Sequence, residues 1–435
     1  GSLVEVGETL NSWPQLSGDV VLGAASVATA IRRIGLGRPL RSGRTRVDVE
    51  QALDALADPE LDTDGHPADP DTDDPVTDDP VGTTVDRILV CAQRAPSGGN
   101  IQPWSLLSTP RETRIALEPG YTTAMDIGCR GSAVAVGAAL YNARVAAAAY
   151  DVLGPHEYLA DADPGSPLTA VLRHGTGTDP ALAADYPYAL ARETNRRLGY
   201  GGQIPAGVLS GLAAAAAAEG ARMRAVADSP GIRTMAAILA ESDRIRYLTP
   251  LLHREMFAEM RWPGDDLTDG IDTRSLELAP DERVALQIGR RADVMAQLHS
   301  WSAGAALGDY ARDRVRSSSA VVALTFTDDP GAEPGALTGY ARAGAAVARL
   351  WIQAQRSGLA VQPMSPVFLF SRSRTELDAL SPAYADRLST LQGRFLEILE
   401  VPEQDSVALV LRLSYAAAAS VRSRRRPVPG ADSRR

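Results

Sequence analysis

Residues 96–104 read PSGGNIQPW, a run that neither a helix nor an ordinary strand accommodates. Consecutive glycines let backbone N–H groups approach a ligand with no Cβ in the way. The amide of Asn100 offers both a donor and an acceptor. Because a residue before proline avoids the α region, the preceding helix should end near Ala95. We therefore expect a ligand-binding loop between a helix and a strand that begins at Trp104.

A second motif is RETNR, which places Thr194 between Arg192 and Arg196. Guanidinium groups bind phosphate oxygens through paired hydrogen bonds, and a hydroxyl group between them completes a cradle for an anion. The segment is therefore a candidate phosphate site. Two arginines around a threonine on a helix are also typical of a solvated face, and this alternative stays open.

The elements around these motifs follow two similar patterns. Residues 131–154 and 339–361 are both rich in small residues, carry apolar residues at helical spacing and contain a glycine near the end that is typical of a C-cap. Strand patterns flank the first helix (RIALEP and LTAVLRH), and SAVVALTFT precedes the second at 319–327. The apolar run SVALVLRLSY predicts a further strand before the basic residues 422–426. The sequence thus predicts two α+β halves in tandem.

Residues 96–104 match the Pro-Ser-x-x-Asn-x-Gln-Pro-Trp signature, and by this match the chain resembles the FMN-dependent nitroreductases. The resemblance implies an α+β sandwich around an antiparallel sheet, in which this loop reaches an FMN bound largely by the partner subunit. It also implies that an Arg-x-Ser/Thr-x-Arg segment and a basic C-terminal tail hold the FMN phosphate. The candidate FMN-binding residues are Pro96, Ser97, Gly98, Asn100, Arg192, Thr194, Arg196, Pro363, Met364, Ser365, Arg422, Arg424 and Arg425, with Arg426 as a further tail candidate.

The segment 363–366 departs from the family. Family members carry a Pro-x-Glu-Gly turn whose backbone N–H faces flavin N5, whereas here Pro363, Met364 and Ser365 are followed by Pro366. Proline has no N–H, so a hydrogen bond to N5 would have to come from Ser365 or earlier. A plain proline-rich turn after a helix is the alternative interpretation.

The motifs are divided between the two predicted halves. The signature loop lies in the first half, at 83–180, and the Arg-Thr-Arg triple, the 363–366 segment and the tail lie in the second half, at 181–435. This division resembles the fused, single-chain Acg-like branch of the family. It implies an internal pseudo-dimer with one complete flavin site and one degenerate site. Residues 261–318 are a possible lid or an ordinary long connection.

Composition limits which structures and sites the rest of the chain can form. Residues 58–80 hold ten of the 54 acidic residues and no Arg, so we expect 58–82 to be a disordered acidic linker between parts that are nearly neutral. Residues 1–57 resemble the C-terminal end of an E1/ThiF-like domain, which implies a longer fused protein. All 44 basic residues are Arg, a usage typical of a GC-rich genome such as that of an actinobacterium, and sites built on Lys are excluded. The two Cys and five His form no disulfide or metal pattern, and no targeting segment is evident, so we expect a cytoplasmic protein without metal.

The resemblance implies an oxidoreductase in which FMN passes a hydride ion from NAD(P)H to an unknown acceptor, with no catalytic side chain. Two alternatives stay open. One is a flavin-binding or sequestering protein without turnover. The other is a flavin module that oxidises a peptide substrate in concert with an E1-like domain. We expect a nicotinamide nucleotide and a small-molecule or peptide substrate as partners, no nucleic acid or membrane, and a homodimer through or with the E1-like domain as one possible assembly.

Overall fold

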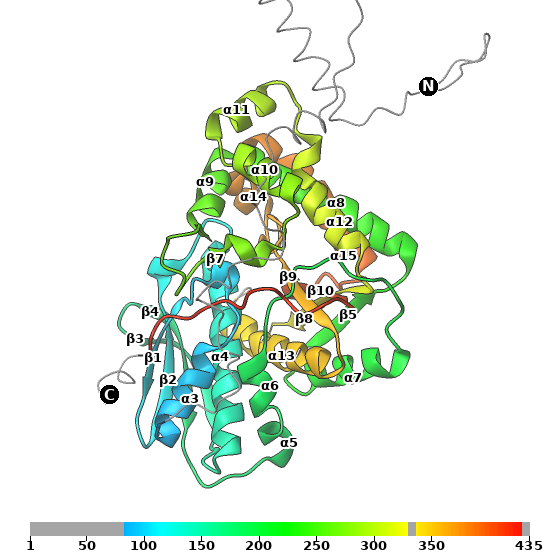
Figure 1. Cartoon of the computed structure of the whole chain (residues 1–435). Helices are drawn as coiled ribbons and strands as arrows, with labels where there is room; N and C mark the ends of the chain where they lie inside the picture. Colours follow the sequence, from blue (N-terminus) through cyan, green and yellow to red (C-terminus); the bar gives the residue numbers. More distant parts are fainter. Residues whose placement is uncertain (1–81, 329–335, 429–435) are drawn as a thin grey trace, which may run out of the picture. The chain divides into compact units, whose positions relative to one another are not determined.

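The computed structural model describes residues 82–328 and 336–428, which all belong to one compact unit, Asp73–Arg435 (Figure 1). The predicted E1/ThiF-like segment and nearly all of the predicted acidic linker lie outside the described residues. Within the unit, helices pack with two four-stranded sheets.

The first sheet contains β1 (Trp104–Ser108), β2 (Glu112–Leu117), β3 (His156–Asp163) and β4 (Ser166–Arg173), in the order β1-β2-β4-β3. All neighbouring strands are antiparallel. Buried and half-buried residues alternate along β2, so one face of this strand is turned to the core. The predicted strands RIALEP and LTAVLRH correspond to β2 and β4.

The second sheet contains β5 (Arg222–Val226), β8 (Ala320–Thr327), β9 (Ala360–Met364) and β10 (Asp405–Ser414), in the order β5-β8-β10-β9. Its pairs are also antiparallel. Seven of the eight residues of β8 are buried, which fits its central position and its continuous apolar sequence. The predicted α+β class with antiparallel sheets is therefore confirmed.

The two sheets are built by the same succession of elements. In the first, α3 (Thr84–Gln93) is followed by β1, β2, α4 (Arg130–Ala149), β3 and β4. In the second, α7 (Ala206–Ala217) is followed by β5, an insertion, β8, α13 (Leu337–Arg356), β9 and β10, with two α-helices and one 3-10 helix between β9 and β10. Matching each element in turn gives an identical strand order in the two sheets. This correspondence supports the interpretation as two halves, which stays a prediction.

The helices α4 and α13 pack against each other at the centre of the core (Figure 1). By length and composition α4 is the one described helix that could cross a membrane, but 89% of its apolar window is buried inside the protein. It is therefore a core helix, as its composition predicted. Both helices end earlier than the predicted ranges 131–154 and 339–361, with Tyr150 as the C-cap of α4 and Ser357 as the C-cap of α13. After α13, Gly358 with a φ of 77° turns the chain toward β9.

The insertion between β5 and β8 begins with α8 (Ser229–Leu248) and ends with α12 (Asp309–Arg316), which packs against α8. Ala311 and Val315 of α12 are buried in the second core cluster, so any lid within 261–318 would have to exclude this helix. The other elements of the insertion are α9 (Pro250–Ala258), β6 (Met260–Arg261), β7 (Ile271–Asp272), η4 (Thr273–Leu276), α10 (Pro280–Gly289), α11 (Ala292–Ser300) and η5 (Ala305–Gly308).

Short elements complete the unit. The helices α14 and α15 add apolar residues to the core cluster beneath the second sheet, and α6 leads into the RETNR segment. The remaining elements are η1 (Gly98–Asn100), η2 (Pro119–Tyr121), η3 (Ile127–Cys129), α5 (Pro180–Ala183), α6 (Tyr186–Ala191), α14 (Arg374–Leu380), η6 (Pro382–Tyr384) and α15 (Ala385–Ile398).

Candidate functional site

The loop 97–102 connects α3 to β1 through a single 3-10 turn with an unusual backbone. Gly99, Asn100 and Gln102 have φ values of 56°, 55° and 51°, in the left-handed region. Only glycine adopts this region without cost, and asparagine tolerates it better than most residues, so the sequence suits the turn. The hydroxyl of Ser97 accepts a hydrogen bond from the N–H of Gln102 (3.0 Å) and closes the loop on itself.

The two glycines of the loop have different surroundings. A Cβ on Gly98 would meet nothing within 4 Å, whereas one on Gly99 would lie 2.8 Å from Cδ of Glu259. Gly98 is exposed and Gly99 is half-buried. The expectation that a ligand approaches the loop at a glycine therefore applies best to Gly98.

The end of the signature, Gln-Pro-Trp, belongs to a buried hydrogen-bond chain. The indole N–H of Trp104 donates to Oε1 of Gln93 (2.8 Å), and Nε2 of Gln93 donates to Oε1 of Gln102 (2.7 Å). All three side chains are buried. The chain ties the end of α3, the loop and β1 into one unit, which holds the loop in a fixed geometry.

The C-terminal tail, residues 415–428, crosses from β10 to this loop (Figure 1). Nδ2 of Asn100 donates to the carbonyl of Arg424 (3.1 Å), and the N–H of Arg426 donates to Oε1 of Gln102 (2.9 Å). The guanidinium group of Arg426 contacts the carbonyls of Ile101 and Gln102 and stacks over the ring of Tyr121. Tail and loop are thus brought together, and their role in binding FMN stays a prediction.

Four arginines gather where α3 ends, and we call Arg94, Arg192, Arg422 and Arg425 the arginine cluster. The guanidinium of Arg192 donates to the carbonyl of Arg94 (2.7 Å) and stacks over the Trp351 ring at 4.7 Å. Arg425 donates to the carbonyls of residues 93, 94 and 95, and Arg422 donates to those of residues 190 and 192. Cations at the carbonyl ends of α3 and α6 are favourable for the helix dipoles.

Three members of the cluster form no ion pair within the part of the chain that the structure describes. Burial, with the nearby Arg422 and Arg94 as smaller causes, lowers the pKa of Arg192 to about 9, and Glu193 opposes this shift. Burial also lowers the pKa of Arg425 well below its usual value, with Arg192, Arg94 and Arg422 as the other causes. Within the described ranges, Arg192, Arg422 and Arg425 donate to carbonyl oxygens and form no ion pair. Such a site stabilises an anion that binds to it.

Two buried polar atoms of this region make no hydrogen bond within the described part of the chain. They are Nε of Arg192 and Oδ1 of Asn100, whose side chains are 6% and 8% exposed. A buried polar group without a partner is costly, so each atom favours a further partner, which would be an acceptor for Nε of Arg192 and a donor for Oδ1 of Asn100.

The RETNR segment is extended and does not form a helix, so the solvated helical face considered for it is wrong. The segment follows α6, and Arg192 already leaves helical geometry with a ψ of 132°. The N–H of Asn195 donates to the carbonyl of Val361 in β9 (2.9 Å). Arg196 donates to Ser275 of η4, to the hydroxyl (3.1 Å) and the carbonyl (3.3 Å). Arg192 and Arg196 therefore have separate partners, and Thr194 lies half-buried between them.

Pro363, Met364 and Ser365 lie at the end of β9 and just beyond it. Met364 is buried in the core cluster beneath the second sheet, and Ser365 is exposed. Pro363 pairs with Leu411 in the strand β9, which corrects the interpretation of this segment as a plain turn. A proline is accommodated there because β9 is an edge strand. No hydrogen bond within the described residues joins Ser365 to the loop 97–102.

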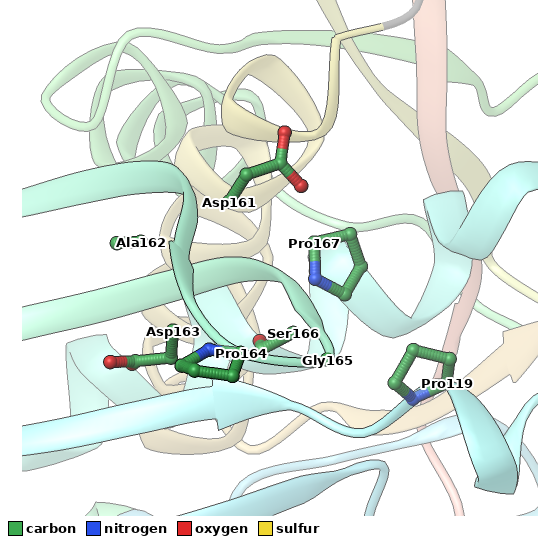
Figure 2. Close-up of a pocket in the computed structure, with 8 residues that line it drawn as sticks. All are labelled: Pro119, Asp161, Ala162, Asp163, Pro164, Gly165, Ser166 and Pro167. Carbon is green, nitrogen blue, oxygen red and sulfur yellow. The ribbon is translucent and has the colours of Figure 1, made fainter.

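A surface hollow of about 560 Å³ lies elsewhere, at the turn between β3 and β4 (Figure 2). Its lining carries two carboxylates, Asp161 and Asp163, and no cation. Asp163 already pairs with Arg114 (2.8 Å) and accepts a hydrogen bond from Thr169 (2.7 Å). This hollow would repel an anion, and none of its residues belongs to the predicted site.

Sequence reasoning missed Gln93, Arg94 and Trp351. Gln93 and Arg94 lie only a few residues before the signature. This closeness in sequence could have identified them as candidate site residues. Trp351 lies in the middle of α13 and contacts Arg192 only because the fold brings α13 beside the RETNR segment. Nothing in its local sequence indicates this role.

Comparison with known proteins gives the following relatives. No family model matches the chain. An uncharacterized protein of Mycobacterium tuberculosis (strain CDC 1551 / Oshkosh), MT1398, is 49% identical over 437 residues, which are 98% of this chain and 59% of that protein. The chain therefore spans about three fifths of the length of the curated relative that it matches.

Among solved structures, iodotyrosine deiodinase bound to FMN and 3-iodo-L-tyrosine is 13% identical, covers 56% of this chain and 96% of its own, and has a TM-score of 0.31. A nitroreductase-like protein from Bacillus cereus is 13% identical, with coverage of 58% and 94% and a TM-score of 0.30. The FMN-dependent nitroreductase NfnB from Mycobacterium smegmatis in complex with NADPH is 14% identical, with coverage of 55% and 89% and a TM-score of 0.28. Because these scores are low, we assign the site from the contacts within this chain.

Proposed function

We propose that this chain is an FMN-binding oxidoreductase of the nitroreductase type, in which a hydride ion passes from NAD(P)H to an acceptor. The observation that carries the proposal is the meeting of three distant segments at the end of α3. The loop 97–102, Arg192 and the tail 422–426 lie together there, with four guanidinium groups and no paired carboxylate at Arg192, Arg422 or Arg425 among the described residues.

The residues present fit a phosphate-bearing flavin. Arg192, Arg422 and Arg425 would hold the phosphate, with Thr194 beside them and the side chain of Arg424 as a further candidate. Ser97, Gly98 and Asn100 would contact the isoalloxazine and its ribityl hydroxyls, and Pro96 would fix the entry to the loop. The unpartnered Nε of Arg192 and Oδ1 of Asn100 support this assignment, since FMN offers both acceptors and hydroxyl donors.

When bound, FMN would supply the hydride chemistry, and the protein would supply position and electrostatics. The hydrogen-bond chain from Trp104 through Gln93 to Gln102 would hold the loop rigid. The arginine cluster would neutralise the phosphate. Arg196 is committed to Ser275, so we assign it a supporting role: it anchors the insertion to the RETNR segment.

A non-catalytic flavin-binding protein is the second candidate, and Pro366 favours it. The exposed Ser365 and the missing N–H of Pro366 leave the segment after β9 with one backbone donor fewer for flavin N5. If Ser365 tunes N5, it must do so through its own N–H or hydroxyl. Bound FMN that neither NADH nor NADPH reduces would decide for this candidate.

The matching succession of elements supports an internal pseudo-dimer with one flavin site per chain. In the second half, α7 and β5 are separated only by residues 218–221, where the first half has the loop 94–103 between α3 and β1. The second half therefore has no counterpart of the loop 97–102, and the second site would be degenerate.

The proposal is tested by adding FMN to the purified chain and recording the visible spectrum after gel filtration. We expect a yellow protein with FMN and chain in equal amounts. Reduction by NADPH or NADH under anaerobic conditions should then bleach the flavin absorbance. A protein that stays colourless in excess FMN would overturn the assignment.

A further inference from the structure

The carboxyl group of Glu259 lies directly against the loop 97–102, although it comes from the insertion. A Cβ on Gly99 would lie 2.8 Å from Cδ of Glu259 and 3.1 Å from its Oε2. Nearby, the carbonyl of Thr268 in the β6–β7 connection accepts a hydrogen bond from Nε2 of Gln102 (2.9 Å). Two separate contacts thus hold the insertion on the loop.

Among the residues that the structure describes, Glu259 forms one ion pair, and the geometry of this pair is loose. The side chain is 14% exposed, and its Oε2 accepts one hydrogen bond of 3.3 Å from Arg246 of α8. The Nε of Arg246 is buried and makes no hydrogen bond within the described part of the chain. An ion pair that only joined two elements would gain most from a close, bidentate geometry. The observed geometry leaves a donor of Arg246 available for a further group.

The surroundings favour the protonated form of Glu259. Burial raises its pKa, Arg246 opposes this most strongly, and the nearby Glu255 raises the pKa further, while Arg261 opposes it. Glu255 is engaged by the N–H of Ala124 (2.9 Å), and Arg261 pairs with Asp269 (2.6 Å). The side chain is therefore positioned to hold a proton beside the loop at higher pH than a solvated glutamate does.

We propose that Glu259 donates a proton to the acceptor bound at the loop 97–102, an inference that rests on the proposed function. Reduction by NAD(P)H gives the acceptor a hydride ion and requires one proton in addition. The O–H bond of Glu259 breaks, the proton joins an oxygen or nitrogen atom of the acceptor, and NAD(P)H leaves as NAD(P)⁺. The resulting carboxylate is stabilised by Arg246, and a proton from water restores the acid. The acceptor class is therefore one that takes up a proton on reduction, such as a quinone.

The test compares E259Q with the wild type and with the control E255Q. With NADPH and 1,4-benzoquinone, we expect E259Q to lower kcat by about 100-fold with little change in KM. Wild-type kcat should be highest below the pKa of Glu259 and fall as the pH rises through it, because the acid must be protonated. E259Q should lose this pH limb, and E255Q should keep it.

A second readout does not depend on turnover. On the proposed geometry, FMN bound at the loop 97–102 would cover Glu259, so the wild type should take up protons from a weakly buffered dye solution when FMN is added. E259Q should take up correspondingly fewer. If the wild type binds no FMN, the proposed function and this inference both fail. If E259Q binds FMN but keeps the wild-type pH limb and proton uptake, only the role of Glu259 is overturned.

If E259Q does not fold, the same pH dependence of kcat is measured on E259D, and this variant then tests the proposal. It keeps the acid on a shorter side chain, so it should lower kcat and retain the pH limb. A pH-independent kcat in a folded E259D would overturn the proposal.

Discussion

Gly137 of α4 and Gly344 of α13 face each other's helix in a reciprocal way. A Cβ on Gly137 would lie 1.7 Å from the carbonyl oxygen of Ala341, and one on Gly344 would lie 2.0 Å from that of Val134. Each glycine follows the first residue of its helix by seven positions, and each contacted carbonyl lies three residues before a glycine. A twofold interface has this reciprocity, so the contact supports the proposed internal pseudo-dimer.

The first prediction concerns this crossing. Gly344→Ala places a methyl group 2.0 Å from the carbonyl oxygen of Val134, which is a severe steric clash. The two central helices α4 and α13 must therefore move apart. We expect a loss of about 3 kcal/mol in the free energy of unfolding, the upper part of the range for overpacked cores. Urea unfolding followed by circular dichroism measures it.

The matched control is Gly211→Ala on α7, where a Cβ meets nothing within 4 Å. It should stabilise the helix by up to about 1 kcal/mol. Equal stability of the two variants would show that the helices do not cross at Gly344.

The second prediction concerns Glu219, which joins the same two helices. Its carboxylate accepts hydrogen bonds from Arg144 of α4 (2.7 Å) and Arg349 of α13 (3.0 Å), and its side chain is 8% exposed. Glu219→Gln removes the charge between two guanidinium groups. We expect a loss of about 3 kcal/mol in the free energy of unfolding.

Glu157→Gln is the control for Glu219, because the pair of Glu157 with Arg173 is about half exposed on both sides. It should change the free energy of unfolding by less than about 1 kcal/mol. A loss of that small size in Glu219→Gln would contradict the bridging role of Glu219.

The sequence predicted the elements whose side chains are buried in a regular pattern. The small-residue helices and the apolar strands β8 and β10 belong to this group. The strand β3 (His156–Asp163) was missed because it is an edge strand with mostly exposed residues, so it has no apolar alternation. The strand β9 was interpreted as a turn because it contains Pro363, which an edge position tolerates.

The site was predictable only where its residues are contiguous. The loop 97–102 carries its left-handed turn and its closing hydrogen bond within itself, so the sequence could predict a loop between α3 and β1, and ligand binding there stays a prediction. The different partners of Arg192 and Arg196 depend on Trp351 and Ser275, which lie far away in the chain. Spacing within RETNR contains no information about those two contacts, and neither does the sequence around Glu259.

The third prediction separates ligand binding from folding within the loop. The Cβ introduced by Gly98→Ala has no atom within 4 Å, so the free energy of unfolding should change little. FMN affinity should fall if the flavin approaches Gly98 closely. Gly99→Ala forces a Cβ into a left-handed residue against Glu259, which should cost about 1–3 kcal/mol of stability. Thermal unfolding without FMN and fluorescence titration with FMN measure the two effects. Unchanged FMN affinity in Gly98→Ala would move the flavin away from this residue.

The fourth prediction concerns Arg192 and its pH dependence. Arg192→Gln removes a charge-assisted contact with phosphate, which should weaken FMN binding by about 1.5–3 kcal/mol, or about 10- to 150-fold. Arg196→Gln should weaken it less, because Ser275 already engages Arg196. With its pKa lowered to about 9, Arg192 is charged below that pH and neutral above it, so wild-type affinity should be retained below pH 9 and fall as the pH rises further. Arg192→Gln should show a smaller fall. Isothermal titration from pH 7 to pH 10 tests this, and equal affinity of wild type and Arg192→Gln at pH 7 would place the phosphate elsewhere.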